Sequence, residues 1–194
     1  MFTREEVLAA ALAITREKGA HAVTARALGE KLGSSSKPIF SLFENMEDVQ
    51  RALLQTADDV YQHYLQSQMQ KSEYPPYKAS GMAYIHFARE ERELFRLLFM
   101  RDRSGEHVQP DNESIRPLLN LIQQAMALTE EEALLFHTEM WVYVHGIATM
   151  IATSYLDWDE ALISRVISDG YMGLKAHYTA RSTQPAPNAC AETD

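Results

Sequence analysis

Residues 3–54 read TREEVLAAALAITREKGAHAVTARALGEKLGSSSKPIFSLFENMEDVQRALL. At the start of this stretch, Thr3 and Glu6 have the spacing of a capping box. Apolar residues then recur at helical spacing until Gly19, a residue type that commonly ends a helix. The pattern predicts a first helix over residues 3–18.

Two short helices are expected next, joined by a turn of small residues. Thr24 is a good N-cap for a helix over residues 25–32, and Gly33 ends that helix. Pro38 suits the first turn of a third helix, because its missing N–H costs little there. Two short helices around a glycine-containing turn are the layout of a helix-turn-helix.

The rest of the chain also has helical period, and no stretch of useful length alternates like a strand. We therefore predict an all-α protein of about nine helices. Beyond the first three, helices are expected at residues 46–70, 77–92, 93–100, 113–127, 130–156 and 159–180.

The pattern divides the chain into three parts. Residues 1–45 are predicted to form a three-helix helix-turn-helix domain that binds DNA. A long helix joins this domain to a larger α-helical domain over residues 46–181, for which the family resemblance given below implies effector binding and dimerisation. Residues 182–194 are low in apolar content and are predicted to be disordered.

Several side chains around the predicted turn have the chemistry that contacts DNA. Hydroxyl groups bond to bases or phosphates, a lysine neutralises a phosphate or bonds to guanine, and a phenylalanine packs on a sugar or a thymine methyl. The candidates are Thr24, Arg26, Ser35, Ser36, Lys37, Phe40 and Ser41. The same pattern also fits a plain three-helix cluster in which Thr24 only caps a helix and Phe40 lies in the core.

This opening stretch resembles the N-terminal DNA-binding region of the TetR family of regulators. The resemblance runs in order through the whole stretch: Thr3 to Leu8, Lys18-Gly19, Thr24-Ala25-Arg26, Leu32 to Ser35, Phe40 to Phe43 and Glu47-Asp48-Val49. It implies a homodimeric transcriptional regulator with a near-palindromic DNA operator. In this family the default action is repression that a small-molecule effector relieves.

The chain departs from the family pattern at three places. The family often has glycine and threonine at Lys37 and Pro38, a tyrosine at Leu42 and a lysine at Met46. That lysine commonly touches a DNA phosphate, so the resemblance does not carry this contact over. Binding would then be weaker, or Lys37 would replace the contact.

The second half carries a further resemblance. Residues 141–148, WVYVHGIA, resemble the tryptophan–histidine–glycine signature of one C-terminal domain subgroup in this family, and residues 94–101 resemble a segment often found upstream. The family dimerises through its last two long helices. Small residues there are the candidate interface, since a mid-helix glycine costs about 1 kcal/mol relative to alanine without a packing reason: Gly146, Thr149, Ala152, Ser168, Gly170 and Gly173. Alternatively, this face packs within one subunit.

An effector site is expected among the helices between residues 46 and 144. Mixed aromatic and methionine walls with a few polar groups suit a drug-sized apolar molecule. The candidate lining residues are Tyr61, Tyr64, Tyr84, Phe87, Phe95, Phe99, Trp141 and His145. The same residues also fit an ordinary core, with His145 as a structural histidine.

The charge of the chain is unevenly distributed. The net charge is −9, yet residues 1–40 carry six basic and four acidic residues. An acidic body would repel DNA and help to orient a weakly basic head. No apolar run approaches the roughly 20 residues of a membrane helix, and residues 1–19 do not form a secretory signal, so a cytoplasmic location is expected.

Two other functions are alternatives to a DNA-binding regulator. An enzyme would need a nucleophile motif, a phosphate loop or a metal-ligand pattern, and the sequence contains none, so neither catalysis nor a cofactor or metal is expected. The single cysteine, Cys190, gives no disulfide and no cysteine-based metal site. The second rival is a helical homodimer that binds a small molecule or a protein partner without binding DNA.

Overall fold

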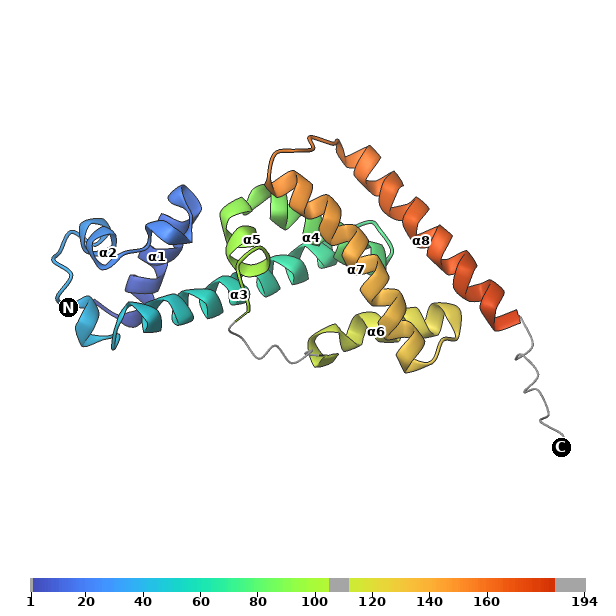
Figure 1. Cartoon of the computed structure of the whole chain (residues 1–194), viewed down its shortest axis with the longest axis horizontal. Helices are drawn as coiled ribbons and strands as arrows, with labels where there is room; N and C mark the ends of the chain where they lie inside the picture. Colours follow the sequence, from blue (N-terminus) through green and yellow to red (C-terminus); the bar gives the residue numbers. More distant parts are fainter. Residues whose placement is uncertain (1, 105–111, 184–194) are drawn as a thin grey trace, which may run out of the picture. The chain divides into compact units, whose positions relative to one another are not determined.

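The computed structural model describes residues 2–104 and 112–183 of the chain (Figure 1). This part is all-helical, which confirms the predicted fold class, and it contains no strand. Its eight α-helices and two short 3₁₀ helices are α1 Arg4–Lys18, η1 Ala20–Ala22, α2 Ala25–Lys31, η2 Ile39–Ser41, α3 Met46–Lys71, α4 Pro76–Glu90, α5 Arg92–Phe99, α6 Asn112–Met126, α7 Glu130–Ala152 and α8 Glu160–Thr183.

The third predicted helix is a single 3₁₀ turn, so the described chain has eight α-helices and not nine. In η2 the N–H groups of Ile39 and Leu42 each reach back three residues, as in a 3₁₀ helix. Pro38 supplies no N–H, and Asn45 is already extended with φ −158°. Too few residues lie between these two points to build successive α-helical turns.

Two helix ends also differ from the prediction. α7 ends at Ala152 and not at residue 156, because Ser154 adopts a left-handed φ of 59° and the N–H of Tyr155 turns back to the carbonyl of Met150. This is a Schellman motif with a serine where glycine is usual. α8 continues to Thr183, into the predicted disordered tail, and the rest of that tail lies outside the described residues.

The chain divides into two compact units that alternate along the sequence. The first unit contains residues 1–110 and 144–158, and the second contains residues 111–143 and 159–194. α7 therefore belongs to the second unit at its start and to the first at its end. The predicted functional boundary after residue 45 stays a prediction.

In the first unit, α3 is the helix on which the others pack. It contacts α1, α4 and α5, and α1 also contacts α2 and α5. α1 and α3 each bury one face with a helical repeat, made of Val7, Ala11 and Ile14 on α1 and Val49, Leu53 and Ala57 on α3. The segment predicted to be a helix-turn-helix is thereby tied, through α1, to the long helix that follows it.

In the second unit, α7 and α8 are joined by aromatic contacts. Phe136 of α7 is fully buried and meets the rings of Tyr171 and Tyr178 edge-on, with centroids 5.6 and 5.4 Å away. The Tyr178 hydroxyl donates to Glu139 at 2.9 Å. These contacts fix the register of the two helices within this unit.

The predicted helix caps at Thr3, Thr24 and Thr129 are present. Thr3 and Glu6 form a reciprocal capping box, and Thr129 and Glu132 form another. Thr24 accepts from the N–H of Ala27 at 3.1 Å. Short-range side-chain chemistry therefore sets three of the helix starts.

The turn after α2 is a Schellman motif built on two glycines. Gly33 has φ +67°, and the N–H of Ser34 donates to the carbonyl of Gly29 at 2.8 Å. A Cβ on Gly29 would lie 2.8 Å from the Ser34 carbonyl oxygen and 3.1 Å from the Ser35 carbonyl carbon. Gly29 thus lets the turn backbone lie directly against α2, which the sequence pattern did not indicate.

We expect Gly29→Ala to lower the free energy of unfolding by about 1–3 kcal/mol, because its methyl group would overlap backbone atoms that cannot rotate away. Urea unfolding monitored by circular dichroism measures the change. Gly81→Ala is the matched control, since its Cβ would meet only a Val144 methyl at 3.5 Å. Equal stability of the two variants would contradict the tight approach.

Candidate functional site

The seven residues predicted to contact DNA lie on the N-terminus of α2 and on the segment from the turn through η2. Thr24, Arg26, Ser35, Lys37, Phe40 and Ser41 are exposed, and Ser36 is half-buried. Phe40 keeps 46% of its surface exposed although it lies between the buried residues Ile39 and Phe43. Phe40 is therefore not a core residue of residues 1–45, as it would be if these residues formed only a plain three-helix cluster.

The basic residues of this region are mostly engaged by the chain's own carboxylates. Arg26 donates to Glu30 at 2.8 Å on the surface of α2, and Lys31 donates to Glu17 at 2.6 Å. Within the described part of the chain, Lys37 is exposed and makes no ion pair or hydrogen bond. Of the two predicted cationic contacts, Lys37 is thus available and Arg26 is occupied.

The start of α3 is acidic. Asn45 caps the helix by accepting from the N–H of Asp48 at 2.9 Å, and Glu47 and Asp48 stand in the first turn. Met46 is half-buried and brings no charge. A phosphate at this helix end would therefore meet carboxylates, and whether Lys37 replaces the family's usual lysine contact stays a prediction.

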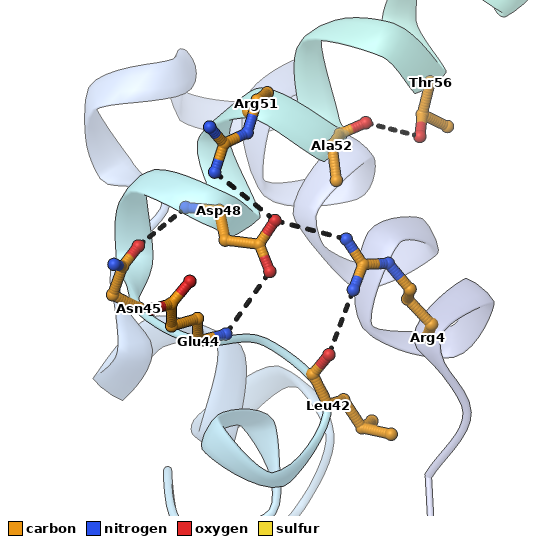
Figure 2. Close-up of polar contacts among 8 residues, drawn as sticks. All are labelled: Arg4, Leu42, Glu44, Asn45, Asp48, Arg51, Ala52 and Thr56. Atoms are coloured by element: carbon orange, nitrogen blue, oxygen red, sulfur yellow. Dashed lines mark hydrogen bonds and ion pairs between the residues drawn. The ribbon is translucent and has the colours of Figure 1, made fainter.

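An arginine that the sequence analysis did not single out ties this region together (Figure 2). Arg4 donates to the Leu42 carbonyl at 3.0 Å and to Asp48 at 3.3 Å, and its guanidinium lies 4.1 Å from the centre of the Phe43 ring. The partners are 38 and 44 residues away in sequence, which is why no local pattern identifies them.

The aromatic residues predicted for the effector site form one cluster in the first unit. Tyr61 lies at its centre, with ring centroids 6.1, 5.0 and 5.1 Å from Tyr84, Phe87 and Phe99. The other members join edge-on or tilted: Tyr64 meets Phe87, and Phe95 meets Tyr84 and Phe99. Because the rings stand at contact distance, an effector entering here would have to separate them.

The cluster also contains polar groups at its edges. The Tyr84 hydroxyl and the His145 Nδ1 are 2.8 Å apart, and Thr149 lies 3.5 Å from the His145 Nε2. The Tyr64 hydroxyl donates to Glu90 at 2.8 Å. Burial raises the pKa of the Tyr61 and Tyr64 hydroxyls and lowers the pKa of the His145 imidazole, so the cluster favours neutral side chains.

Trp141 is placed differently from the other candidate effector residues. It stands on the part of α7 that belongs to the second unit and keeps 44% of its surface exposed. The remaining seven candidates are brought together in the first unit.

The predicted interface residues differ in their surroundings. Ala152 is fully buried and its carbonyl accepts from Arg96, while Ser168 and Thr149 are half-buried. A Cβ on Gly170 would lie 2.8 Å from the Tyr143 ring, which gives this glycine a packing reason within the chain. A Cβ on Gly146 or on Gly173 would meet nothing within 4 Å.

The comparison with protein families bears on the second half of the chain. Residues 77–168 match the family model described as the tetracyclin repressor-like C-terminal domain. The tetracyclin repressor-like region covers just under half of the chain, from α4 into α8, and includes the WVYVHGIA and LFRLLFMR segments. It does not reach residues 3–54. No curated protein matches the chain.

The described residues were also compared with what a metal site and a membrane-spanning helix require. No group of three or more histidine, cysteine, aspartate or glutamate side chains among residues 2–104 and 112–183 could hold a metal ion. None of the helices described there is long and apolar enough to cross a membrane.

Stability should fall as the pH drops from about 7.5 to 5.5. Burial lowers the pKa of His145 and of His137, so the unfolded chain takes up protons at a higher pH than the folded chain does. The stability these groups contribute is present above about 6.5, the ordinary histidine value, and is lost below it. His145→Gln, which can still bond to Tyr84, should weaken this dependence of the melting temperature.

The matched control is His63→Gln, because His63 is exposed on α3. A wild-type melting temperature that is constant over this range, or a His63→Gln effect equal to that of His145→Gln, would contradict the assignment.

Proposed function

We propose that this chain is a homodimeric transcriptional regulator of the TetR type, which binds a near-palindromic operator and is released from it by a small-molecule ligand. The observation that carries the proposal is the order of two features along one chain. A glycine-built helix-turn-helix segment comes first, and a region matching the tetracyclin repressor-like C-terminal domain follows it.

In this proposal the duplex meets the exposed face formed by α2 and η2. Lys37 neutralises a phosphate or bonds to guanine, and Phe40 packs on a sugar or a thymine methyl. Ser35 stands two residues before Lys37 in sequence, and both are exposed. Because η2 is one short turn, few base contacts are available to each subunit, and specificity would depend on two subunits reading two half-sites.

Glu30 would limit the affinity for DNA. Its carboxylate holds Arg26 at 2.8 Å, although both side chains are largely exposed. A phosphate must displace Glu30 before Arg26 can bind it. An exposed ion pair of this kind contributes little, because water screens it, so the expected effect is modest.

Dimerisation is supported by apolar side chains that the second unit leaves exposed. Leu135 and Val142 lie seven residues apart on one face of α7 and are 48% and 59% exposed, and Met172 on α8 is 60% exposed. Gly173 is next to Met172, and a Cβ there would meet no atom within 4 Å among the described residues. A second copy of α7 and α8 covering this surface would account for both observations.

The ligand in this proposal acts on the aromatic cluster of the first unit. A molecule with apolar faces could replace some of the ring-to-ring contacts around Tyr61, and the Tyr84–His145 pair could accept or donate one hydrogen bond to it. Release requires that the ligand bind the DNA-free conformation more tightly than the DNA-bound one. If no compound or cell extract changes operator affinity, the release step is wrong.

The alternative, a helical homodimer that does not bind DNA, is favoured by one observation. The start of α3 presents Glu47 and Asp48 beside the candidate DNA-contacting turn, and most nearby basic residues are paired. The first experiment decides between these two functions.

Selection from a random duplex pool with the full-length protein should enrich a near-palindromic sequence. Lys37→Ala combined with Ser35→Ala should abolish the enrichment, because it removes the available cation and an exposed hydroxyl. For the selected duplex, Lys37→Ala alone should weaken binding and reduce the salt slope by about 1 per subunit. Fluorescence anisotropy at several salt concentrations measures both.

Two further variants sharpen this test. Lys71→Ala makes the same charge change at the far end of α3 and should leave binding unchanged. Glu30→Gln frees Arg26 and should strengthen binding by about two- to fivefold. No enrichment at low salt would favour the dimer that does not bind DNA.

Met172→Glu should convert the dimer to a monomer, because it places a charge in the middle of the proposed apolar interface. Sedimentation velocity over a range of concentrations measures the association, and circular dichroism shows whether the variant is folded. Tyr155→Glu is the control, since Tyr155 is 78% exposed but lies in the loop after α7. A monomeric wild type, or a Met172→Glu dimer of unchanged stability, would argue against this interface.

A further inference from the structure

Arg4 contacts Leu42 and Phe43, which follow η2, and Asp48 in the first turn of α3. Figure 2 shows its hydrogen bonds to Leu42 and Asp48. One guanidinium nitrogen donates to the Leu42 carbonyl, the other donates to Asp48, and the planar group lies over the Phe43 ring. Arg4 is the first residue of α1, directly after the Thr3 cap. The capping box therefore fixes the backbone from which this side chain extends.

Besides Arg4, two buried side chains and a contact between η2 and α2 hold the segment around η2. η2 spans Ile39–Ser41, and only Ile39 and Phe43 are buried on either side of Phe40 and Ser41. The Ser41 hydroxyl donates to the Pro38 carbonyl, a bond inside the segment that does not attach it to a helix. Through Arg4, α1 thus contacts the segment at the Leu42 carbonyl and the Phe43 ring.

Asp48 connects this grip to α3. One of its oxygens accepts from Arg4, and the other accepts from the N–H of Glu44 at 3.3 Å. The backbone hydrogen bond from Glu44 and then the charge of Arg4 lower the pKa of the Asp48 carboxyl. Arg51 also reaches this carboxylate, at 3.7 Å, from the next turn of α3.

An arginine suits this place better than a lysine does. The guanidinium is planar, so it can donate to two acceptors in its plane while its face lies on the Phe43 ring. An ammonium group at the same position would keep the charge but could not make these three contacts with fixed geometry.

We propose that Arg4 is a positioning residue for DNA recognition: it holds η2 and the residues around it against α1 and α3, so that Phe40 and Lys37 are presented to the duplex. This inference rests on the proposed function, but its structural part concerns the free protein. Arg4 acts through Leu42, Phe43 and Asp48 and need not touch DNA.

The test compares Arg4→Lys and Arg4→Ala with Arg51→Ala in the full-length protein. Arg51→Ala is the matched control, because it removes an arginine from the same carboxylate without touching Leu42 or Phe43. Hydrogen exchange by mass spectrometry reports the amides of residues 36–45 in the free protein. Affinity for the duplex selected with wild type is measured at several salt concentrations.

Both Arg4 variants should exchange faster over residues 36–45 while the α3 peptides stay protected. They should also bind the duplex about tenfold more weakly, the equivalent of one charge-assisted hydrogen bond. The salt slope should stay unchanged, and Arg51→Ala should resemble wild type in both measurements.

Three results would overturn the proposal. Unchanged hydrogen exchange and unchanged affinity in Arg4→Lys would show that the Arg4 contacts neither hold residues 36–45 nor support DNA binding. Weaker binding with a salt slope smaller by about 1 would make Arg4 a direct phosphate contact. If wild type enriches no duplex, the proposed function fails first and the positioning role fails with it, whatever the exchange shows.

Discussion

The continuity of α3 is the constraint on which the first unit depends. This single helix, Met46–Lys71, buries Val49 and Leu53 beside α1 and carries Tyr61 at the centre of the aromatic cluster. At 1.5 Å per residue, Val49 and Tyr61 are separated by about 18 Å of hydrogen-bonded backbone. α3 contains no proline or glycine, the residues at which helices most often kink. Under the proposed function, a displacement of Tyr61 would therefore tilt the N-terminal end of α3.

A second connection runs through the corner between α4 and α5. Glu90 accepts a hydrogen bond from the Tyr64 hydroxyl of the aromatic cluster. The next residue, Glu91, accepts two hydrogen bonds of 2.8 Å from Arg16 of α1. The neighbouring carboxylates of Glu90 and Glu91 thus link the aromatic cluster to α1, which contacts α3. Under the proposed function, a ligand that moved Tyr64 would act on residues 1–45 through this corner as well as through α3. The shift it could cause is limited by the difference between its affinities for the DNA-free and the DNA-bound conformation.

The sequence predicts well what local chemistry decides. Capping residues such as Thr3 and Thr24 and the apolar repeat located most helices to within a few residues. The errors arise where distant contacts or backbone geometry decide: Pro38 and Asn45 leave η2 as one turn, and Ser154 ends α7 early. For the same reason the candidate site was only partly predictable. The Arg4 contacts join residues 38 and 44 positions apart, which no local pattern identifies. The pairing of Arg26 with Glu30, by contrast, has the i,i+4 spacing of an ion pair on one helix face, and the sequence analysis did not single it out.

Several basic residues near the candidate DNA-contacting turn form ion pairs with the chain's own carboxylates, and this determines how an acidic chain could recognise DNA. Carboxylates hold Arg4, Arg26 and Lys31, so these residues contribute little long-range attraction for a polyanion. Under the proposed function, DNA affinity that rests on unspecific charge would therefore be small, and the net charge of −9 would lower it further. Under the proposed function, binding would become useful only when two correctly positioned heads meet two half-sites together. The geometry of the turn then matters more than the number of positive charges, which is why a residue that holds the turn, such as Arg4, can outweigh one that merely adds charge.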